Sequence, residues 1–207
     1  MARAATLVMA LFVLSRLLGL GRQIIVSAYF GTSGNLDAYL AANRITETIF
    51  LIVAGGALGS AFIPTFADHL ARDDHAGAWE LLSAVINLAM IAMTVAVGLI
   101  ALFAPALVRV VIAPGFDVTR QRLTVRLLRL MLVTPVVFSV SGVVMSALNA
   151  HQHFLLPALA PSIYNLSIIL GAILLGPRYG VAGMAVGVVV GSGLHLLVQI
   201  PQLLRFG

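Results

Sequence analysis

ATLVMALFVLSRLLGLGRQIIVSAY, residues 5–29, indicates the class of this protein. It is long enough for one helix to cross a bilayer, which takes about 20 mostly apolar residues. Its only charged residues, Arg16 and Arg22, lie well inside the apolar run. The run does not end in a cleavage-type site of small residues, so we interpret it as a retained membrane span rather than a signal peptide.

The composition of the whole chain agrees with a membrane protein. Of its 207 residues, 61% are hydrophobic and 9% are charged, against roughly 25% charged in soluble domains. The mean hydropathy is +1.09. So few charges would not cover a water-facing surface, whereas apolar surface facing lipid carries no such cost. The net charge of +5 favours contact with anionic lipid headgroups or an anionic substrate. The arginines do not gather on one polar face, so we do not expect nucleic acid as a partner.

Apolar stretches separated by turn residues continue to the end of the chain. Because backbone groups in lipid must be paired within the protein, each stretch is predicted to be a helix. The predicted fold is an all-α membrane protein, with residues 1–207 forming one bundle of six transmembrane helices. The six predicted spans cover residues 5–29, 37–66, 78–112, 123–149, 156–176 and 180–205.

The first span carries Ser15 and two arginines without an acidic residue near them. Ser15 and Arg22 are seven residues apart and share nearly one helix face, with Arg16 roughly a third of a turn away. An arginine at the centre of a membrane helix costs about 3 kcal/mol on insertion scales. We therefore expect Arg16 and Arg22 to face water or protein, where a guanidinium with spare donors suits phosphate. The alternative is that they reach the headgroup level along their apolar stems.

The second span places acids beside its arginine. Asp37 and Arg44 are seven residues apart, and Arg44 and Glu47 stand at i and i+3. Arg44 is therefore expected either to contact an anionic substrate or to pair with these two carboxylates. Asn43 adds a further polar group to this part of the span.

Small residues recur every fourth position in the sixth span, at Gly183, Gly187 and Gly191, with His195 next in the series. Such spacing predicts close helix packing, with the lining of a solvated cavity as the alternative, and we interpret His195 as a packing residue. The chain has no cysteine, which excludes thiolate metal sites. It also shows no phosphate-binding loop and no nucleophile–base set, so we expect no enzymatic activity, no cofactor and no metal.

A series of short motifs resembles the MurJ/MviN family in order and spacing, over essentially the whole chain. Single motifs are weak, but together they are fairly specific. The motifs are Ser15–Arg22 (SRLLGLGR), Tyr29–Gly31, Asp37–Tyr39, Ala61–Pro64, Ala113–Phe116, Leu148–Ala150, Phe154–Ala158 and Gln199–Leu203.

The resemblance implies a flippase for lipid II, the undecaprenyl-diphosphate-linked peptidoglycan precursor, in the bacterial cytoplasmic membrane. The family belongs to the multidrug/oligosaccharidyl-lipid/polysaccharide exporter superfamily, whose two six-helix lobes surround a central cavity. This chain would be the amino-terminal lobe. The second lobe would lie in the same longer chain or be a second copy, and transport would follow alternating access. The resemblance also implies a cytoplasmic amino terminus, although the arginines of the loops favour the opposite orientation.

The resemblance suggests roles for particular residues. Arg16, Arg22 and Asp37 match functional residues of the family, and Arg44 stands where members often carry a basic residue. A further family arginine and a glutamate would fall at Phe50 and Gly55, where this chain departs from the pattern. The expected substrate-binding set is Arg16, Arg22, Arg44, Asp37, Ser15, Asn43 and Glu47.

Three other functions remain open at the level of the sequence. The departures at Phe50 and Gly55 leave room for a different polyprenyl-diphosphate-linked glycan. A cation-coupled drug exporter of the same superfamily would need a deep carboxylate, for which Glu47 is the candidate. A non-transporting membrane scaffold would tolerate the loss of Arg16 and Arg22.

Overall fold

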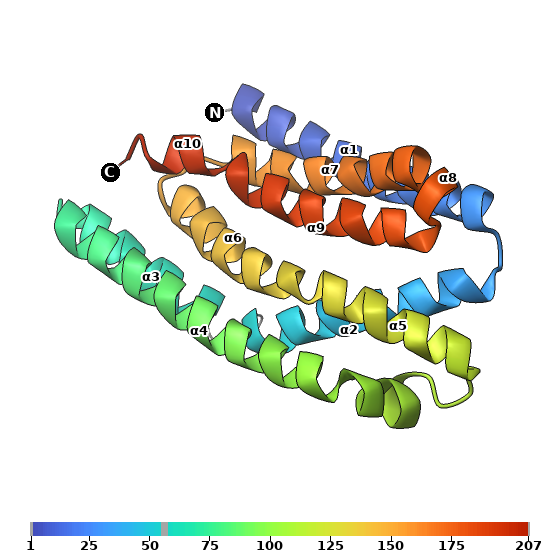
Figure 1. Ribbon diagram of the computed structural model, residues 1–207. Helices are drawn as coiled ribbons and strands as arrows, with labels where there is room; N and C mark the ends of the chain where they lie inside the picture. The colour runs from blue at the N-terminus through green and yellow to red at the C-terminus, as the bar shows by residue number, and fades with distance from the viewer. Residues whose placement is uncertain (1, 55–57, 207) are drawn as a thin grey trace.

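A computed structural model describes residues 2–54 and 58–206, and the side chains of residues 6–49, 51 and 62–206. Within these ranges the chain is helical and contains no strand (Figure 1). The described helices are α1 (Ala2–Phe30), α2 (Gly34–Ala54), α3 (Leu58–Ala71), α4 (His75–Leu107), η1 (Val108–Ile112), α5 (Val118–Met131), α6 (Val133–Ala150), α7 (Leu155–Leu170), η2 (Gly171–Leu175), α8 (Gly176–Tyr179), α9 (Val181–Leu197) and α10 (Ile200–Leu203).

Five of the predicted spans correspond to helical segments that are long and apolar enough to cross a membrane. These segments are Thr6–Phe30, His75–Ile112, Val118–Ala150, Leu155–Tyr179 and Val181–Leu203. They confirm the all-α membrane class.

The predicted second span, 37–66, corresponds instead to two helices, α2 and α3. Residues 55–57 between them lie outside the described residues, as does the side chain of Phe50, so neither departure from the family pattern is placed. α3 has 14 residues and is shorter than the roughly 20 that a span needs. α2 is long enough, but three charged side chains lower its hydropathy. A sixth span therefore stays a prediction.

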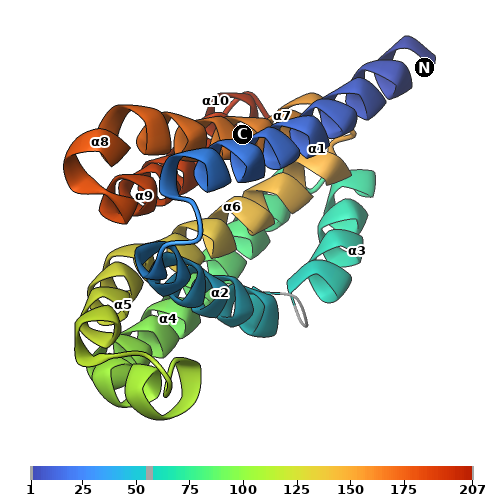
Figure 2. The same cartoon turned by 90° about the vertical axis from the view of Figure 1, so that its right-hand side faces the viewer.

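The helices form two groups that meet along α9 and α6. α1 lies along α7, and α7 lies along α9, on one side of Figure 1. α2 packs against α5 and α6, and α4 packs along α6, on the other side. Figure 2 shows that α1 and α2 leave their short connection in different directions, each following its own group. The core between the groups is apolar and includes Met131, Ile168 and Met184, all buried.

The glycine series of α9 is the surface on which α7 packs. A Cβ built on Gly187 would lie 2.7 Å from the carbonyl oxygen of Ser167, and one on Gly191 would lie 2.9 Å from Cδ2 of Tyr164. Contacts this short leave no room for a side chain. The prediction of close packing in the sixth span is confirmed for this pair of helices.

α1 packs on the bundle along one side and leaves most of its apolar surface uncovered. Leu7, Met9, Phe12 and Leu17 are exposed, and none of the 18-residue apolar window of this helix is buried inside the protein. In water this surface would be unfavourable, whereas hydrocarbon accepts it without cost. Its exposure fits a helix whose outer side contacts lipid.

Candidate functional site

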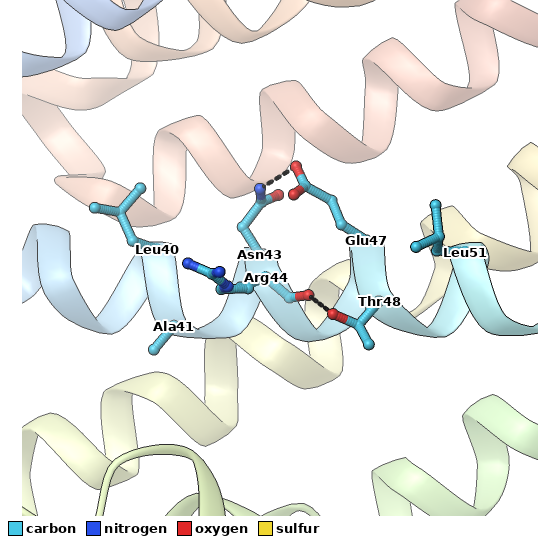
Figure 3. A pocket seen from close by; sticks show the side chains of 7 residues that line it. All are labelled: Leu40, Ala41, Asn43, Arg44, Glu47, Thr48 and Leu51. Atoms are coloured by element: carbon cyan, nitrogen blue, oxygen red, sulfur yellow. Dashed lines mark hydrogen bonds between the residues drawn. The ribbon is translucent and has the colours of Figure 1, made fainter.

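The polar residues of α2 line an open groove beside the helix (Figure 3). Its volume is about 630 Å³. The spacing of the lining residues is close to 3.6 per turn, which gathers them on one side of the helix. Because they all belong to α2, the described groove has one wall. The lining residues are Leu40, Ala41, Asn43, Arg44, Glu47, Thr48 and Leu51.

Asn43 and Glu47 form a hydrogen-bonded pair in this groove. The Nδ2 of Asn43 donates to Oε1 of Glu47 at 2.7 Å, one helical turn away. Asn43 is half-buried and Glu47 is exposed. The amide therefore holds one carboxylate oxygen of Glu47 and leaves the other open to the groove.

Arg44 extends its guanidinium into the groove without an acidic partner. In Figure 3 its side chain points away from Glu47, and its carbonyl oxygen accepts a hydrogen bond from Oγ1 of Thr48 at 2.8 Å. Among the described residues, no ion pair joins Arg44 to Asp37 or to Glu47. The two ion pairs that the spacing allows are thus not formed among the described residues. The donors of the exposed guanidinium remain available to an anion.

Asp37 has a separate position in the first turn of α2. Its carboxylate is exposed. A negative charge there is favourable because the N-terminal end of a helix carries a partial positive charge. In the described structure Asp37 supports α2 rather than lining the groove with Arg44.

The two arginines of α1 differ in their surroundings. Arg22 is half-buried and lies close enough to Tyr39 and Tyr164 to interact electrostatically with both, as Glu47 also does. Arg22 therefore lies in the neighbourhood of α2 and α7. Arg16 is exposed, and neither arginine belongs to the residues that line the groove.

Ser15 contributes through its backbone. The Nδ2 of Asn165 on α7 donates to the carbonyl oxygen of Ser15 at 3.4 Å. This bond ties α1 to α7 and gives Ser15 a packing role. Of the seven residues expected to bind substrate, the structure gathers Asn43, Arg44 and Glu47 in one groove.

A second cavity, of about 430 Å³, lies between α2, α6, α7 and α9 and was not predicted from the sequence. Its lining residues come from four separate helices, so the residue spacing within one helix does not predict it. His195 was interpreted as a packing residue; it is buried as expected but also lines this cavity. The lining residues are Thr46, Glu47, Leu51, Thr134, Phe138, Gly142, Met145, Tyr164 and His195.

Comparisons with known proteins agree with this fold. The lipid II flippase MurJ of Burkholderia cenocepacia is 30% identical over 205 residues, which cover 97% of this chain and 40% of that protein. The lipid II flippase MurJ of Thermosipho africanus is 30% identical over 193 residues, covering 92% of this chain and 39% of that protein. The chain thus spans about 40% of the length of these relatives.

Solved structures show the same architecture. A lipid II flippase MurJ in an inward closed conformation matches with a TM-score of 0.77 and 28% identity, over 97% of this chain and 41% of that chain. A transporter of the MOP superfamily from Pyrococcus furiosus shares the fold at a TM-score of 0.73 and 14% identity, over 94% of this chain and 43% of its own. The family model described as lipid II flippase MurJ matches residues 26–207, so this chain belongs to the MurJ family.

Proposed function

We propose that this chain is the amino-terminal lobe of a flippase that carries lipid II across the bacterial cytoplasmic membrane. The observation that carries the proposal is the unpaired Arg44 guanidinium in an open groove on a membrane-protein fold of the MurJ family. Relatives named lipid II flippase cover nearly the whole chain and give the proposal its substrate.

The substrate diphosphate is the group that Arg44 would bind. A guanidinium donates two parallel hydrogen bonds to phosphate oxygens and keeps its charge at any physiological pH. Arg22 would add a second positive charge from the α1 side, and Arg16 would attract the anion from the exposed part of the same helix. Glu47 is hydrogen-bonded to Asn43 and no ion pair joins it to Arg44 among the described residues, so the guanidinium donors stay available to the anion.

The groove also suggests how the rest of the transporter is arranged. A space with one wall releases its ligand to the surroundings, so a second lobe is needed to enclose the substrate. We propose that this lobe lies in the same longer chain, with a second copy as the alternative, and that the two lobes rock about the site. The polyprenyl tail and the exposed apolar side chains of α1 would face membrane lipids.

The orientation follows from the family resemblance, with the amino terminus in the cytoplasm. This chain lacks cysteine, so in a full-length protein whose remaining cysteines have been replaced, a single introduced thiol reports its own side of the membrane. Thr32→Cys, between α1 and α2, is expected to react with an impermeant maleimide added to intact cells. Arg72→Cys, between α3 and α4, is expected to react only after permeabilisation. The reverse pattern would contradict this orientation.

The transport role is tested in cells depleted of their own lipid II flippase and supplied with the full-length gene. Arg44→Ala and Arg22→Ala are expected to reduce rescue strongly, because each removes a charge from the proposed diphosphate site. Arg72→Ala is the matched control, since this exposed arginine lies outside the groove. Protein levels in the membrane are measured in parallel.

The outcome separates transport from the other hypotheses. Rescue at the wild-type level by both Arg44→Ala and Arg22→Ala would remove the diphosphate-binding role and favour a scaffold. Failure of the wild-type gene to rescue, with normal protein levels, would favour a different substrate. The exposure of lipid II at the outer surface of the same cells gives the direct readout.

A further inference from the structure

The inner cavity between α2, α6, α7 and α9 adjoins the groove in which the diphosphate is proposed to bind. Glu47 and Leu51 line both spaces, so the two meet at this part of α2. The cavity volume of about 430 Å³ falls within the roughly 300–1,000 Å³ of small-molecule sites. A substrate held in the groove has this cavity as its neighbouring space.

A chain of three buried side chains determines how His195 presents its ring. The amide nitrogen of Gln199 donates to the carbonyl oxygen of His195 at 2.8 Å and to Oγ of Ser141 at 2.9 Å, so both of its hydrogens are used. The Ser141 hydroxyl accepts from Gln199, and its Oγ lies 2.7 Å from Nδ1 of His195, the one acceptor found for its hydrogen among the described residues. When Ser141 donates this hydrogen to Nδ1, the single hydrogen of a neutral imidazole lies on Nε2. In this tautomer His195 is a donor through its Nε2–H.

This donor has no acceptor among the described residues. His195 is only 7% exposed and belongs to the lining of the cavity. Nε2 of His195 is not among the fully buried polar atoms without a partner, so it stays open to the cavity. A ligand in the cavity that offers an oxygen acceptor would satisfy it.

Acceptors and aromatic rings complete the lining. The Thr46 hydroxyl donates to the carbonyl of Asn43 in α2, and the Thr134 hydroxyl donates to the carbonyl of Met131 at the end of α5, so their oxygens remain acceptors. Glu47 adds a carboxylate. Phe138 and Tyr164 line the same space and meet edge to face, with ring centroids 5.1 Å apart. The cavity thus offers a donor, several acceptors and aromatic surface within a mostly apolar enclosure.

A sugar matches this combination of groups. Its hydroxyls both donate and accept, whereas its C–H faces pack on aromatic rings. We propose that the inner cavity is the subsite for the sugar next to the diphosphate, with His195, Glu47 and Thr134 as its hydrogen-bonding groups. The proposal rests on the diphosphate role of the groove and extends it to the glycan.

The test compares two probes on the purified full-length protein in detergent. One probe is undecaprenyl diphosphate, and the other is the same lipid carrying one N-acetylhexosamine. Gly142→Leu fills the cavity, since a Cβ at Gly142 meets no atom within 4 Å and Gly142 lines the space. This variant is expected to bind the sugar-bearing probe about tenfold more weakly, a change of about 1.4 kcal/mol, and to bind undecaprenyl diphosphate as the wild type does.

Gly193→Leu is the matched control. It changes a half-buried glycine of α9 that also has open space at its Cβ position but does not line the cavity. Thr134→Val is a smaller change. It is expected to weaken the binding of the sugar-bearing probe by about threefold and to leave the binding of undecaprenyl diphosphate unchanged. Its control is Thr124→Val, because Thr124 is equally buried and bonds a backbone carbonyl of its own helix.

The outcomes separate the two proposals. Wild-type affinity of Gly142→Leu and Thr134→Val for the sugar-bearing probe would overturn the sugar subsite while leaving diphosphate binding intact. An equal loss of affinity for both probes in these variants, with Gly193→Leu and Thr124→Val unaffected, would also overturn it. The cavity would then not distinguish the sugar-bearing lipid from the lipid without sugar. Absence of binding of either probe to the wild type would overturn the proposed function itself, and the sugar subsite with it.

Discussion

Gly187→Ala is expected to destabilise the packing of α9 on α7 more than its single methyl group suggests. The new Cβ would lie 2.7 Å from the carbonyl oxygen of Ser167 and 3.1 Å from Cα of Ile168. Both are backbone atoms, so no side chain can rotate away and the two helices must separate. Overpacking of this kind costs about 1–3 kcal/mol, less the gain of about 0.8–1 kcal/mol from replacing glycine in a helix.

Gly193→Ala on the same helix isolates the packing contribution. Its Cβ meets no atom within 4 Å, so only the helix-propensity gain of about 0.8–1 kcal/mol applies. The two alanine variants should therefore differ by about 1–3 kcal/mol in free energy of unfolding, with Gly187→Ala the less stable. Titration with dodecyl sulfate in mixed micelles, followed by circular dichroism, measures this difference. Equal stability of the two variants would refute the packing argument.

Two further predictions concern groups outside the membrane spans. Asp117 caps α5 by accepting from the backbone N–H groups of Arg120 and Thr119, and the N–H of Arg120 is the main cause that lowers the pKa of its carboxyl below the ordinary value. Its contribution to stability is present above the ordinary carboxyl pKa of 3.8 and is lost as the pH falls through the lower folded value. The acid unfolding profile of Asp117→Asn should lack this contribution. An unchanged profile would argue against it. His151 stacks on Phe206 with ring centroids 4.2 Å apart, and burial, followed by the nearby His75, lowers its pKa from 6.5. Because the folded state disfavours its protonation, stability is expected to fall as the pH drops below about 6.5. His151→Phe should remove this part of the pH dependence in a thermal unfolding series, and retention of the full dependence would assign it to another group.

Much of the fold follows from local chemistry that is visible in the residues. A helix in lipid pairs its own backbone, so the length of each apolar run predicts a span without knowledge of its neighbours. The glycine series at Gly183, Gly187 and Gly191 predicts close packing because glycine has no Cβ to separate two helices. The motif Ser15–Arg22 indicates the family through its order of residues, which can be recognised without knowledge of tertiary contacts.

The second span shows where this local reasoning ends. Asp37, Arg44 and Glu47 stand at helical spacings that allow two ion pairs, and spacing alone does not choose between pairing and substrate binding. In the folded protein the Asn43 amide bonds Glu47, and Arg44 forms no ion pair with either carboxylate among the described residues.

The sequence by itself determined the membrane class, the helical content and the polar side of α2, because each depends on residues close together in the chain. The tertiary structure alone decided which of those polar groups act together. The inner cavity exists because α2, α6, α7 and α9 meet, and Nδ1 of His195 contacts the hydroxyl of Ser141, 54 residues away along the chain. Contacts across such separations arise from packing, and no periodicity within a single helix records them.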